Sequence, residues 1–319
     1  MRVQLSAERP GFCLPIERAL KRLRRYLAIV GAVLLTAQGA WAQNLFVTGT
    51  DNITHSIYEF TPGGSGSTFA TISDGPQGIA FNSNGDMYVA DGQSNIYKFA
   101  PDGTRTTFAS GLSSTNDLAF DGAGYLYESD FGSGNIYRFA SDGTRTTFAS
   151  GLFNTPPPDG ARGLVFDSLG NLYLGYGGSI LKFTSGGNQS TFATGLDFAV
   201  GLACDASDNI YAANYHTGVI SKFTPGGFGS VFASGFNSPN GLAFDSAGNL
   251  FVGDGGNNRI IEIDPGGSES TFASNVAGAN YLAFRPRTST PEPFTLCLGL
   301  AGIGVFLRRK LKTKGPSAE

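Results

Sequence analysis

The stretch GLAFDSAGNLFVGDGGNNRIIEIDPGGSESTFAS, residues 241–274, holds the pattern that decides the fold. It contains four short apolar runs rich in β-branched and aromatic residues: Leu242–Phe244, Leu250–Val252, Ile260–Ile263 and Ser270–Ala273. Turn-forming segments such as DSAGN and PGG separate these runs. Because runs this short and this closely spaced leave no room for a helix, the stretch predicts one sheet of four antiparallel strands.

The same phrase recurs along the chain. Close copies begin at Gly78, Asp117 and Gly241, weaker copies begin at Gly163 and Gly201, and a stub, YLAF, begins at Tyr281. Successive starts differ by 39, 46, 38, 40 and 40 residues, and the long interval contains the insertion TPPP, residues 155–158. A unit of about 40 residues with four strands is the blade of a β-propeller.

The two ends of the repeat region complete each other. Residues 44–47, NLFV, match the second strand of a blade, residues 55–70 supply the third and fourth, and the stub at Tyr281 supplies the missing first strand. We therefore predict an all-β fold over residues 43–286, a six-bladed β-propeller of four-stranded antiparallel blades. Pairing of the two chain ends closes the ring and removes an exposed sheet edge.

The phrase GLAFDSAGNLFVGDGGNNRI resembles the NHL repeat and the related gluconolactonase/senescence-marker and streptogramin-lyase-like propellers. The resemblance spans residues 44–286. The only tryptophan, Trp41, precedes this region, so a WD40 propeller would lack its own signature. Since these relatives include enzymes, ligand sensors and plain scaffolds, the resemblance implies the fold and leaves the function open.

Residues 1–42 have the anatomy of a secretory signal peptide. Lys21, Arg22, Arg24 and Arg25 precede an apolar run, residues 26–36, which is followed by the small-x-small pattern Ala40-Trp41-Ala42. The apolar run is short of the ~20 residues that a membrane span needs. The sequence thus predicts export, with signal peptidase as a processing partner and a mature chain that begins near Gln43.

Residues 287–319 resemble the PEP-CTERM sorting segment. Pro291-Glu292-Pro293 is followed by a short apolar run, residues 294–307, and by a basic end that includes Arg308 and Arg309. The resemblance implies an exosortase-type processing enzyme, transient anchoring in the inner membrane through a C-terminal helix, and delivery to the cell surface or extracellular matrix of a Gram-negative bacterium. Whether the tail is cleaved stays open.

Charge and cysteine content narrow the function. Residues 44–290 carry 21 acidic and 10 basic residues, a formal charge near −11, which argues against nucleic acid as a partner. Cys13 and Cys297 lie in the end segments, so Cys204 is the only thiol of the propeller and no internal disulfide can form.

The candidate site lies at one end of the central channel, here called the top face. Loops before the first strand and after the second strand of each blade open there. The residues before the first strands are Gln77, Asn116, Arg162, Val200, Asn240 and Asn280, and those that end second strands include Asp91, Asp130, Asn214 and Asp254. These groups could hold a cation such as Ca²⁺ or hydrogen-bond sugar hydroxyls. Alternatively, they are turn residues that bond their own backbone.

Two functions remain in view. The lactonase-like relatives hold a divalent metal at this mouth with one glutamate, asparagines and one aspartate, and Asn240 in PNGL matches one metal-ligand asparagine. The family's remaining pattern is not reproduced, because Asn116-Asp117 is displaced and no glutamate stands on a first strand. We therefore expect no catalytic residues and no cofactor, and a non-enzymatic surface module that binds an extracellular glycan or protein. The alternative is a metal-dependent lactonase-like hydrolase.

Overall fold

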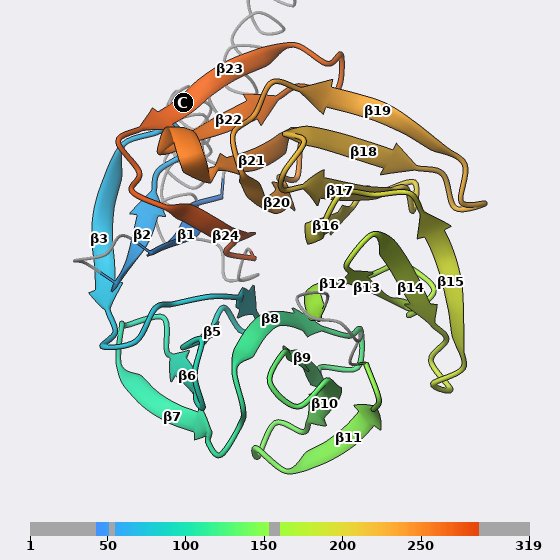
Figure 1. Cartoon of the computed structure of the whole chain (residues 1–319). Helices are drawn as coiled ribbons and strands as arrows, with labels where there is room; N and C mark the ends of the chain where they lie inside the picture. Colours follow the sequence, from blue (N-terminus) through green and yellow to red (C-terminus); the bar gives the residue numbers. More distant parts are fainter. Residues whose placement is uncertain (1–42, 51–54, 153–159, 287–319) are drawn as a thin grey trace, which may run out of the picture.

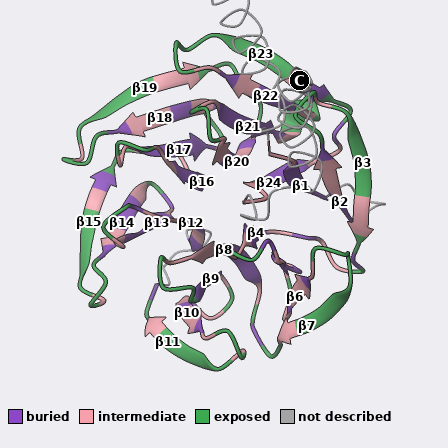
Figure 2. Cartoon of the chain, turned by 180° about the vertical axis from the view of Figure 1, so that it is seen from behind, coloured by how far each residue is buried: buried purple, intermediate pink, exposed green. Residues whose placement is uncertain are grey.

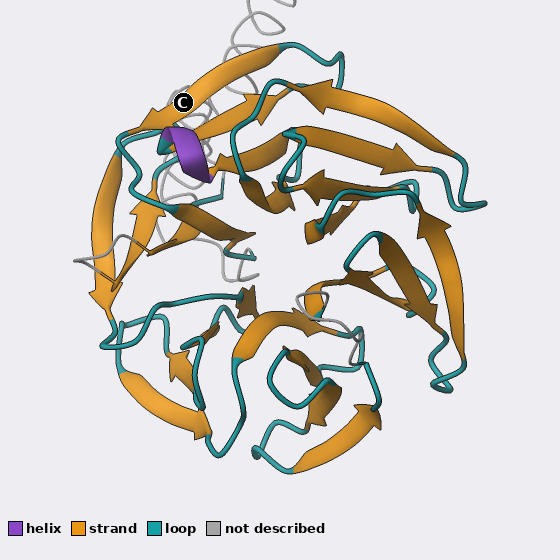
Figure 3. Ribbon diagram, viewed as in Figure 1, coloured by secondary structure: helices purple, strands orange, loops and turns teal. Residues whose placement is uncertain are grey.

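The computed structural model describes residues 43–50, 55–152 and 160–286. These residues form 24 strands in six four-stranded antiparallel sheets, arranged as blades around a central axis (Figure 1). Their only helical element is a single 3₁₀ turn, Gly255–Asn257 (Figure 3). The all-β six-bladed propeller expected from the repeat is confirmed.

The strands follow the predicted order, with the first strand of each blade innermost. Blade 1 consists of β24 (Ala279–Phe284), β1 (Leu45–Thr50), β2 (His55–Phe60) and β3 (Gly66–Thr71). Blade 2 consists of β4 (Ile79–Phe81), β5 (Met87–Ala90), β6 (Ile96–Phe99) and β7 (Arg105–Ala109). Blade 3 consists of β8 (Thr115–Phe120), β9 (Leu126–Asp130), β10 (Asn135–Phe139) and β11 (Arg145–Ala149).

Blades 4 to 6 repeat the arrangement. Blade 4 consists of β12 (Ala161–Phe166), β13 (Leu172–Tyr176), β14 (Ser179–Phe183) and β15 (Gln189–Thr194). Blade 5 consists of β16 (Ala199–Cys204), β17 (Ile210–Asn214), β18 (Val219–Phe223) and β19 (Gly229–Ser234). Blade 6 consists of β20 (Pro239–Phe244), β21 (Leu250–Asp254), β22 (Arg259–Ile263) and β23 (Glu269–Ser274).

Blade 1 closes the ring from both chain ends. β24 pairs with β1 in antiparallel register, with Leu45 opposite Phe284 and Val47 opposite Leu282. The amide of Arg285 also donates to the carbonyl of Asn44 at 3.1 Å. The predicted pairing of the stub at Tyr281 with the N-terminal strand is confirmed, so β1 is an interior strand of its sheet and not an edge.

First strands begin earlier than the apolar runs suggested. In blade 6 the ladder starts at Pro239, opposite Asp254, and a register shift separates this pair from Leu242 opposite Val252. The two residues inside this β-bulge are Asn240 and Gly241. Five blades have this bulge, which directs the residue before the repeat start away from the regular ladder. Blade 2 lacks the shift, and its residue Gln77 precedes β4.

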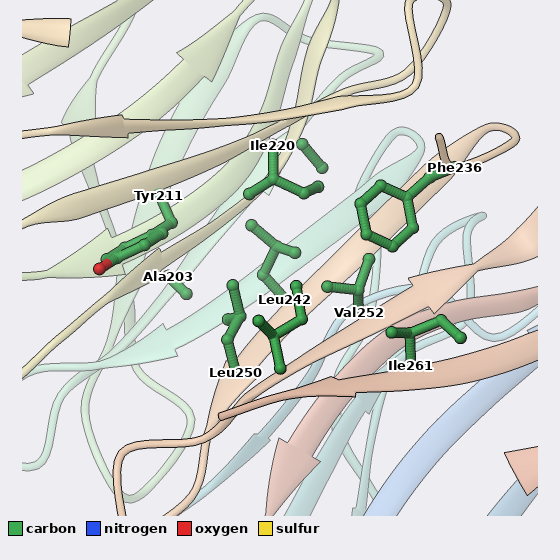
Figure 4. Packing of buried hydrophobic residues seen from close by; sticks show 10 residues of the cluster. Ala203, Tyr211, Ile220, Phe236, Leu242, Leu250, Val252 and Ile261 are labelled. Atoms are coloured by element: carbon green, nitrogen blue, oxygen red, sulfur yellow. The ribbon is translucent and has the colours of Figure 1, made fainter. Parts of the chain in front are cut away.

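Aromatic side chains fill the space between adjacent blades. The ring of Tyr211 on β17 lies 5.0 Å from that of Phe232 on the same blade and 5.0 Å from that of Phe244 on blade 6, both edge to face. Buried residues concentrate on inner strands, and the outer strands are exposed (Figure 2). The close-up in Figure 4 shows Leu242, Val252 and Phe236 packed in the same interface. A phenylalanine recurs on the fourth strands, and Phe232 and Phe272 among them are partly buried and pack against these interblade cores.

Glycine allows the inner strands to approach one another. A Cβ atom at Gly201 would lie 2.0 Å from the carbonyl oxygen of Asn240 in the next blade, and one at Gly163 would lie 2.1 Å from that of Val200. Larger residues at these positions would push neighbouring blades apart. The repeat therefore begins with glycine in four of the six blades.

The expected processing segments, 1–42 and 287–319, lie outside the described residues, and so do the sorting residues Pro291, Glu292, Pro293, Arg308 and Arg309. Among the residues that the structure does describe, we find no helix with the length and apolar character needed to cross a membrane.

Candidate functional site at the top face

Amide side chains of three adjacent blades meet at the top of the channel. The Nδ2 group of Asn280 in blade 1 donates to Oε1 of Gln77 in blade 2 at 2.9 Å. Oδ1 of Asn116 in blade 3 accepts a hydrogen bond from the hydroxyl of Tyr281. Asn116 and Asn280 are buried, and Gln77 is half-buried. The structure thus brings three of the predicted residues together as an amide rim.

Asn240 lies in blade 6, which borders blade 1, and the carbonyl oxygen of Asn280 lies against the neighbouring Gly241. Asn240 is half-buried, and its own carbonyl oxygen lies against Gly201 of blade 5. The equivalent position of blade 5 is the buried, apolar Val200. The side-chain hydrogen bonds of the amide rim thus involve blades 1 to 3, and Asn240 lies beside the blade 1 end of the rim.

The predicted carboxylates at the ends of second strands fasten loops. Asp130 accepts hydrogen bonds from the backbone amides of Ser113 at 2.7 Å and Ser133 at 2.8 Å. In the same way Asp91 accepts from the amides of Gln93 and Asn95. All three of Asp91, Asp130 and Asp254 are fully buried. These contacts account for aspartate at such positions through turn geometry alone.

Asp254 also fastens a loop through its carboxylate, and in addition it pairs with a charged residue. Its Oδ1 accepts from the backbone amide of Asn237 at 2.7 Å, and its Oδ2 accepts from Nε of Arg259 at 2.6 Å and Nδ2 of Asn257 at 2.9 Å. In blade 5, Oδ1 of Asn214 accepts from the amide of Asp197 at 2.9 Å. Second-strand ends therefore join the two top loops of their own blade.

Arg162, the predicted residue of blade 4, stacks between aromatic rings of the neighbouring blades. Its guanidinium carbon lies 5.0 Å from the ring centroid of Phe131 and 4.4 Å from that of Phe198. The imidazole of His216 stacks on Phe198 with centroids 5.1 Å apart, and Tyr215 packs edge-on against both rings. We call these five residues of blades 3, 4 and 5 the aromatic cluster.

Phe198 adopts a backbone conformation that an aromatic residue avoids. Its φ is 58°, whereas the equivalent residues of three other blades, also at positive φ, are the small Ser114, Ser238 and Gly278. The left-handed region costs a non-glycine residue ~1–2 kcal/mol. The surrounding structure therefore holds the ring of Phe198 on the top face in spite of this backbone cost.

Sequence reasoning named Arg162 but missed the aromatic residues around it. A usable signal was present, because Phe131 and Tyr215 directly follow Asp130 and Asn214, the ends of their second strands. His216 follows Tyr215 in the same loop. In the structure its Nδ1 lies 3.2 Å from Oδ1 of Asp197, so the imidazole is held against Phe198.

Sequence reasoning also missed a buried polar junction between blades 3 and 4. The Oδ1 and Oδ2 atoms of Asp117 accept from the backbone amides of Leu118 and Leu164, each at 2.8 Å. The amide of Asp117 donates to Oγ of Ser129 at 3.0 Å, and that hydroxyl donates to the carbonyl of Arg162 at 2.6 Å. Burial raises the pKa of Asp117 to about 7.

Glu128 on β9 is a second buried carboxyl of blade 3. It is fully buried, and neither of its oxygens has a hydrogen-bond partner in the part of the chain that the structure describes. Burial and the charge of Asp130 raise its pKa well above the ordinary value, which favours the neutral acid.

The metal set of lactonase-like relatives does not fit this mouth. Within residues 43–50, 55–152 and 160–286, no three histidine, cysteine, aspartate or glutamate side chains are grouped so that they could hold a metal ion. Asp91, Asp130 and Asp254 are engaged by their loops, and the amides of Asn280 and Gln77 are bonded to each other. What the top face offers a ligand is amide groups, aromatic rings and one guanidinium.

The NHL repeat family matches residues 236–262, which cover β20, β21 and the start of β22. This match lies within blade 6 and the loop before it. No protein in the curated collection matches the chain.

Several solved structures share the fold. A chain of the nidogen/laminin complex is 22% identical, with a TM-score of 0.66, over 76% of this chain and 98% of that one. A gluconolactonase from Xanthomonas campestris is 16% identical, with a TM-score of 0.60, over 74% and 89% of the two chains. A virginiamycin B lyase from Staphylococcus aureus is 16% identical, with a TM-score of 0.52, over 66% and 76%. At these identities the likeness shows a common propeller architecture.

Proposed function

We propose that this protein is an exported, non-enzymatic binding module that holds an extracellular glycan or protein on its top face. The observation that carries the proposal is the aromatic cluster beside the amide rim. Arg162, Phe131 and Phe198 present ring faces and a planar cation, and Gln77, Asn116 and Asn280 supply donors and acceptors next to them.

Of the two ligand classes, a glycan fits this chemistry better. Sugar rings offer apolar C–H faces that pack on aromatic side chains, and hydroxyl groups that both donate and accept hydrogen bonds to amides. His216 is exposed and Tyr215 is half-exposed, so the cluster is accessible. A protein partner, as in the nidogen/laminin complex that shares the fold, is the other outcome of the test.

The hydrolase alternative has less support. Asn240 is the one residue that matches the lactonase metal motif, and no carboxylate of the predicted ring is free of loop contacts. A metal-bound water needs charge neutralisation and a general base beside it. A Ca²⁺-dependent rise in melting temperature that is lost in Asn240→Ala, together with turnover of any lactone, would reverse the assignment.

The binding experiment uses the exported protein on a glycan array, followed by calorimetry with each hit. Phe198→Ala and Arg162→Ala should each weaken binding at least tenfold, since each removes a stacking partner. Phe228→Ala is the matched control, because Phe228 is an equally large ring, 80% exposed, in the hairpin between β18 and β19. If both top-face variants bind the glycan hits as tightly as the unmodified protein does, the glycan site lies elsewhere. If no glycan binds and a secreted protein does, the ligand is a protein.

The terminal segments carry the proposal of export. We propose that signal peptidase removes residues 1–42 and that an exosortase-type enzyme processes the precursor near Pro291-Glu292-Pro293 after transient anchoring in the inner membrane. Mass spectrometry of the mature protein should find an N-terminus near Gln43. An intact N-terminus in cytoplasmic protein would contradict this, and replacement of the three sorting residues should retain unprocessed precursor at the inner membrane.

A further inference from the structure

A cavity of about 240 Å³ occupies the central channel below the amide rim. The innermost strands β4, β8, β12, β16, β20 and β24 surround this channel (Figure 1). Each strand contributes one large aliphatic residue at the same repeat position, and all six are buried: Ile79, Leu118, Leu164, Leu202, Leu242 and Leu282. Every blade thus contributes one member of an aliphatic ring to the cavity wall, although more of the exposed wall is polar than apolar.

One carboxyl group lines this aliphatic cavity. Asp117 occupies the repeat position directly before the aliphatic residue, where four other blades have glycine and blade 1 has Tyr281. Tyr281 also lines the cavity, and its hydroxyl donates to Asn116 of the amide rim. Asp117 and Tyr281 therefore lie at the upper level of the cavity, and Cys204 and Phe244 lie at the lower ends of their strands.

The carboxyl of Asp117 lacks a cationic partner among the cavity-lining residues. Its two oxygens accept only one backbone amide each, from Leu118 and Leu164, and no lysine or arginine lines the cavity. A buried carboxylate without a counter-charge is costly. A positively charged group placed in the cavity would relieve that cost and would use the remaining lone pairs of the carboxylate.

The size and the wall determine the rest of the ligand. At a liquid-water share of ~30 Å³ per molecule, the cavity holds on the order of eight water-sized groups. The aliphatic ring favours a short hydrocarbon portion of the ligand, and the polar part of the wall favours its charged end. A short alkyl chain with one ammonium end has both the required size and the required polarity.

We propose that the central channel binds a small primary alkylammonium ion, with its ammonium group on the carboxylate of Asp117 and its alkyl chain within the aliphatic ring. This site is separate from the top face, and it does not depend on the proposed glycan or protein binding. No residue of the amide rim or of the aromatic cluster lines the cavity. The cavity is connected to the rim by the hydrogen bond from Tyr281 to Asn116.

The test uses the exported protein and n-butylammonium in calorimetry. n-Butylammonium should bind, and 1-butanol of the same length should not. Going from n-propylammonium to n-butylammonium should tighten binding about fourfold, the expected gain for one buried methylene. Equal binding of amine and alcohol, or no binding of the amine, would overturn the proposal.

The pH dependence identifies the carboxyl involved. The pKa of Asp117 is raised to about 7, whereas an alkylammonium keeps its charge to a pH of about 10. Affinity should therefore fall on the order of thirtyfold between about pH 8.5 and about pH 5.5, because only ~3% of such a carboxyl is ionised at the lower pH. An exposed carboxylate of ordinary pKa would give no change over this range.

Variants distinguish the titration of Asp117 from that of the other titratable groups around the channel. Burial raises the pKa of Tyr281 well above its ordinary value and that of Cys204 to about 12, so neither titrates in this range. The guanidinium of Arg162 stays charged. Asp117→Asn should abolish amine binding, whereas Glu128→Gln, the matched change at the other buried acid, should keep both the affinity and its pH profile. If Asp117→Asn does not fold, a flat pH profile in the unmodified protein is enough to refute the site.

Discussion

Blade 3 and blade 6 have the same strands and different interiors near the axis. Blade 6, which contains the NHL match, has Gly241, Val252 and Gly253 where blade 3 has Asp117, Glu128 and Ser129. The interblade aromatic packing is nevertheless alike, since Tyr211 and Tyr127 each lie 5.0 Å from the first-strand phenylalanine of the next blade. The comparison shows that the shared pattern maintains the fold, and that the departures from it carry the distinctive chemistry.

The residues in which blade 3 departs from the repeat pattern are unfavourable for stability at the buried positions that they occupy. Glu128 stands in a position that is aliphatic in every other blade, and its oxygens have no hydrogen-bond partner among the described residues. Asp117 lies where glycine relieves crowding elsewhere, and it is bonded to the next blade instead. Four changes test how far the two blades are interchangeable.

The largest effect is expected when the acid of blade 3 is copied into blade 6. Val252→Glu places a carboxyl among Leu242, Leu250 and Ile261 in a fully buried position, so we expect a loss of up to about 5 kcal/mol of unfolding free energy. Chemical denaturation measures it. Val252→Leu is the control, since blade 4 has Leu174 at this position, and its added methylene should cost only ~1–3 kcal/mol. Equal stability of both variants would show that the position tolerates charge.

The second effect concerns pH. Because burial raises the pKa of Asp117 from 3.8 to about 7, the folded state binds this proton more tightly than the unfolded state. The stabilisation is complete below the unfolded pKa and is lost as the pH rises through about 7. Relative to Asp117→Asn, the unmodified protein should lose on the order of 4 kcal/mol between about pH 4 and about pH 8. Parallel pH profiles of the two proteins would contradict this.

The third change should stabilise the protein by removing an unfavourable buried group from blade 3. Glu128→Val installs the residue of blade 6 and should stabilise the protein by about 2 kcal/mol, because a buried carboxyl without partners is replaced by an aliphatic group. The gain should be larger at about pH 8 than at about pH 4, since the raised pKa of Glu128 means that its neutral form is the better tolerated one. Glu128→Gln no longer titrates, so it should show the pH-dependent part of the gain, but it keeps a buried polar group and should stay less stable than Glu128→Val. A destabilised Glu128→Val would indicate that the acid has a stabilising partner.

The smallest effect concerns the hydroxyl that joins blades 3 and 4. Ser129→Ala leaves the amide of Asp117 and the carbonyl of Arg162 without this partner, and it should cost about 1 kcal/mol. Thermal denaturation at constant pH measures the change. Ser230→Ala, at an exposed position of β19, should stay within ~0.5 kcal/mol of the unmodified protein. An equal result for the two variants would remove this junction from the account.

Much of the candidate site could be located, but not described, from the sequence. The repeat starts placed Gln77, Asn116, Arg162 and Asn280 on the top face, because each precedes a first strand at a fixed repeat position. The contacts between them depend on rotamers and on the bulge geometry, which the repeat pattern does not specify. The carboxylates of Asp91, Asp130 and Asp254 were therefore treated equally as ligands and as turn residues, and the structure shows their loop contacts.

The aromatic cluster was missed for a different reason. Phe131, Arg162 and Phe198 are far apart in the sequence and belong to three successive blades. Each residue alone looks like an ordinary loop residue, and only the rotation from one blade to the next brings them together. The same applies to Tyr281 and Asn116, which meet across the ring because the last strand returns to blade 1.

The sequence by itself determined the number of blades, the four strands of each blade and the closure of the ring. These follow from local alternation of apolar residues, turn chemistry and the repeat period, all of which act over a few tens of residues. Only the tertiary structure decided which polar residues are buried without partners, which rings stack, and what lines the channel. Such features depend on distances between strands of different blades, and those distances are set when the six sheets pack together around a common axis.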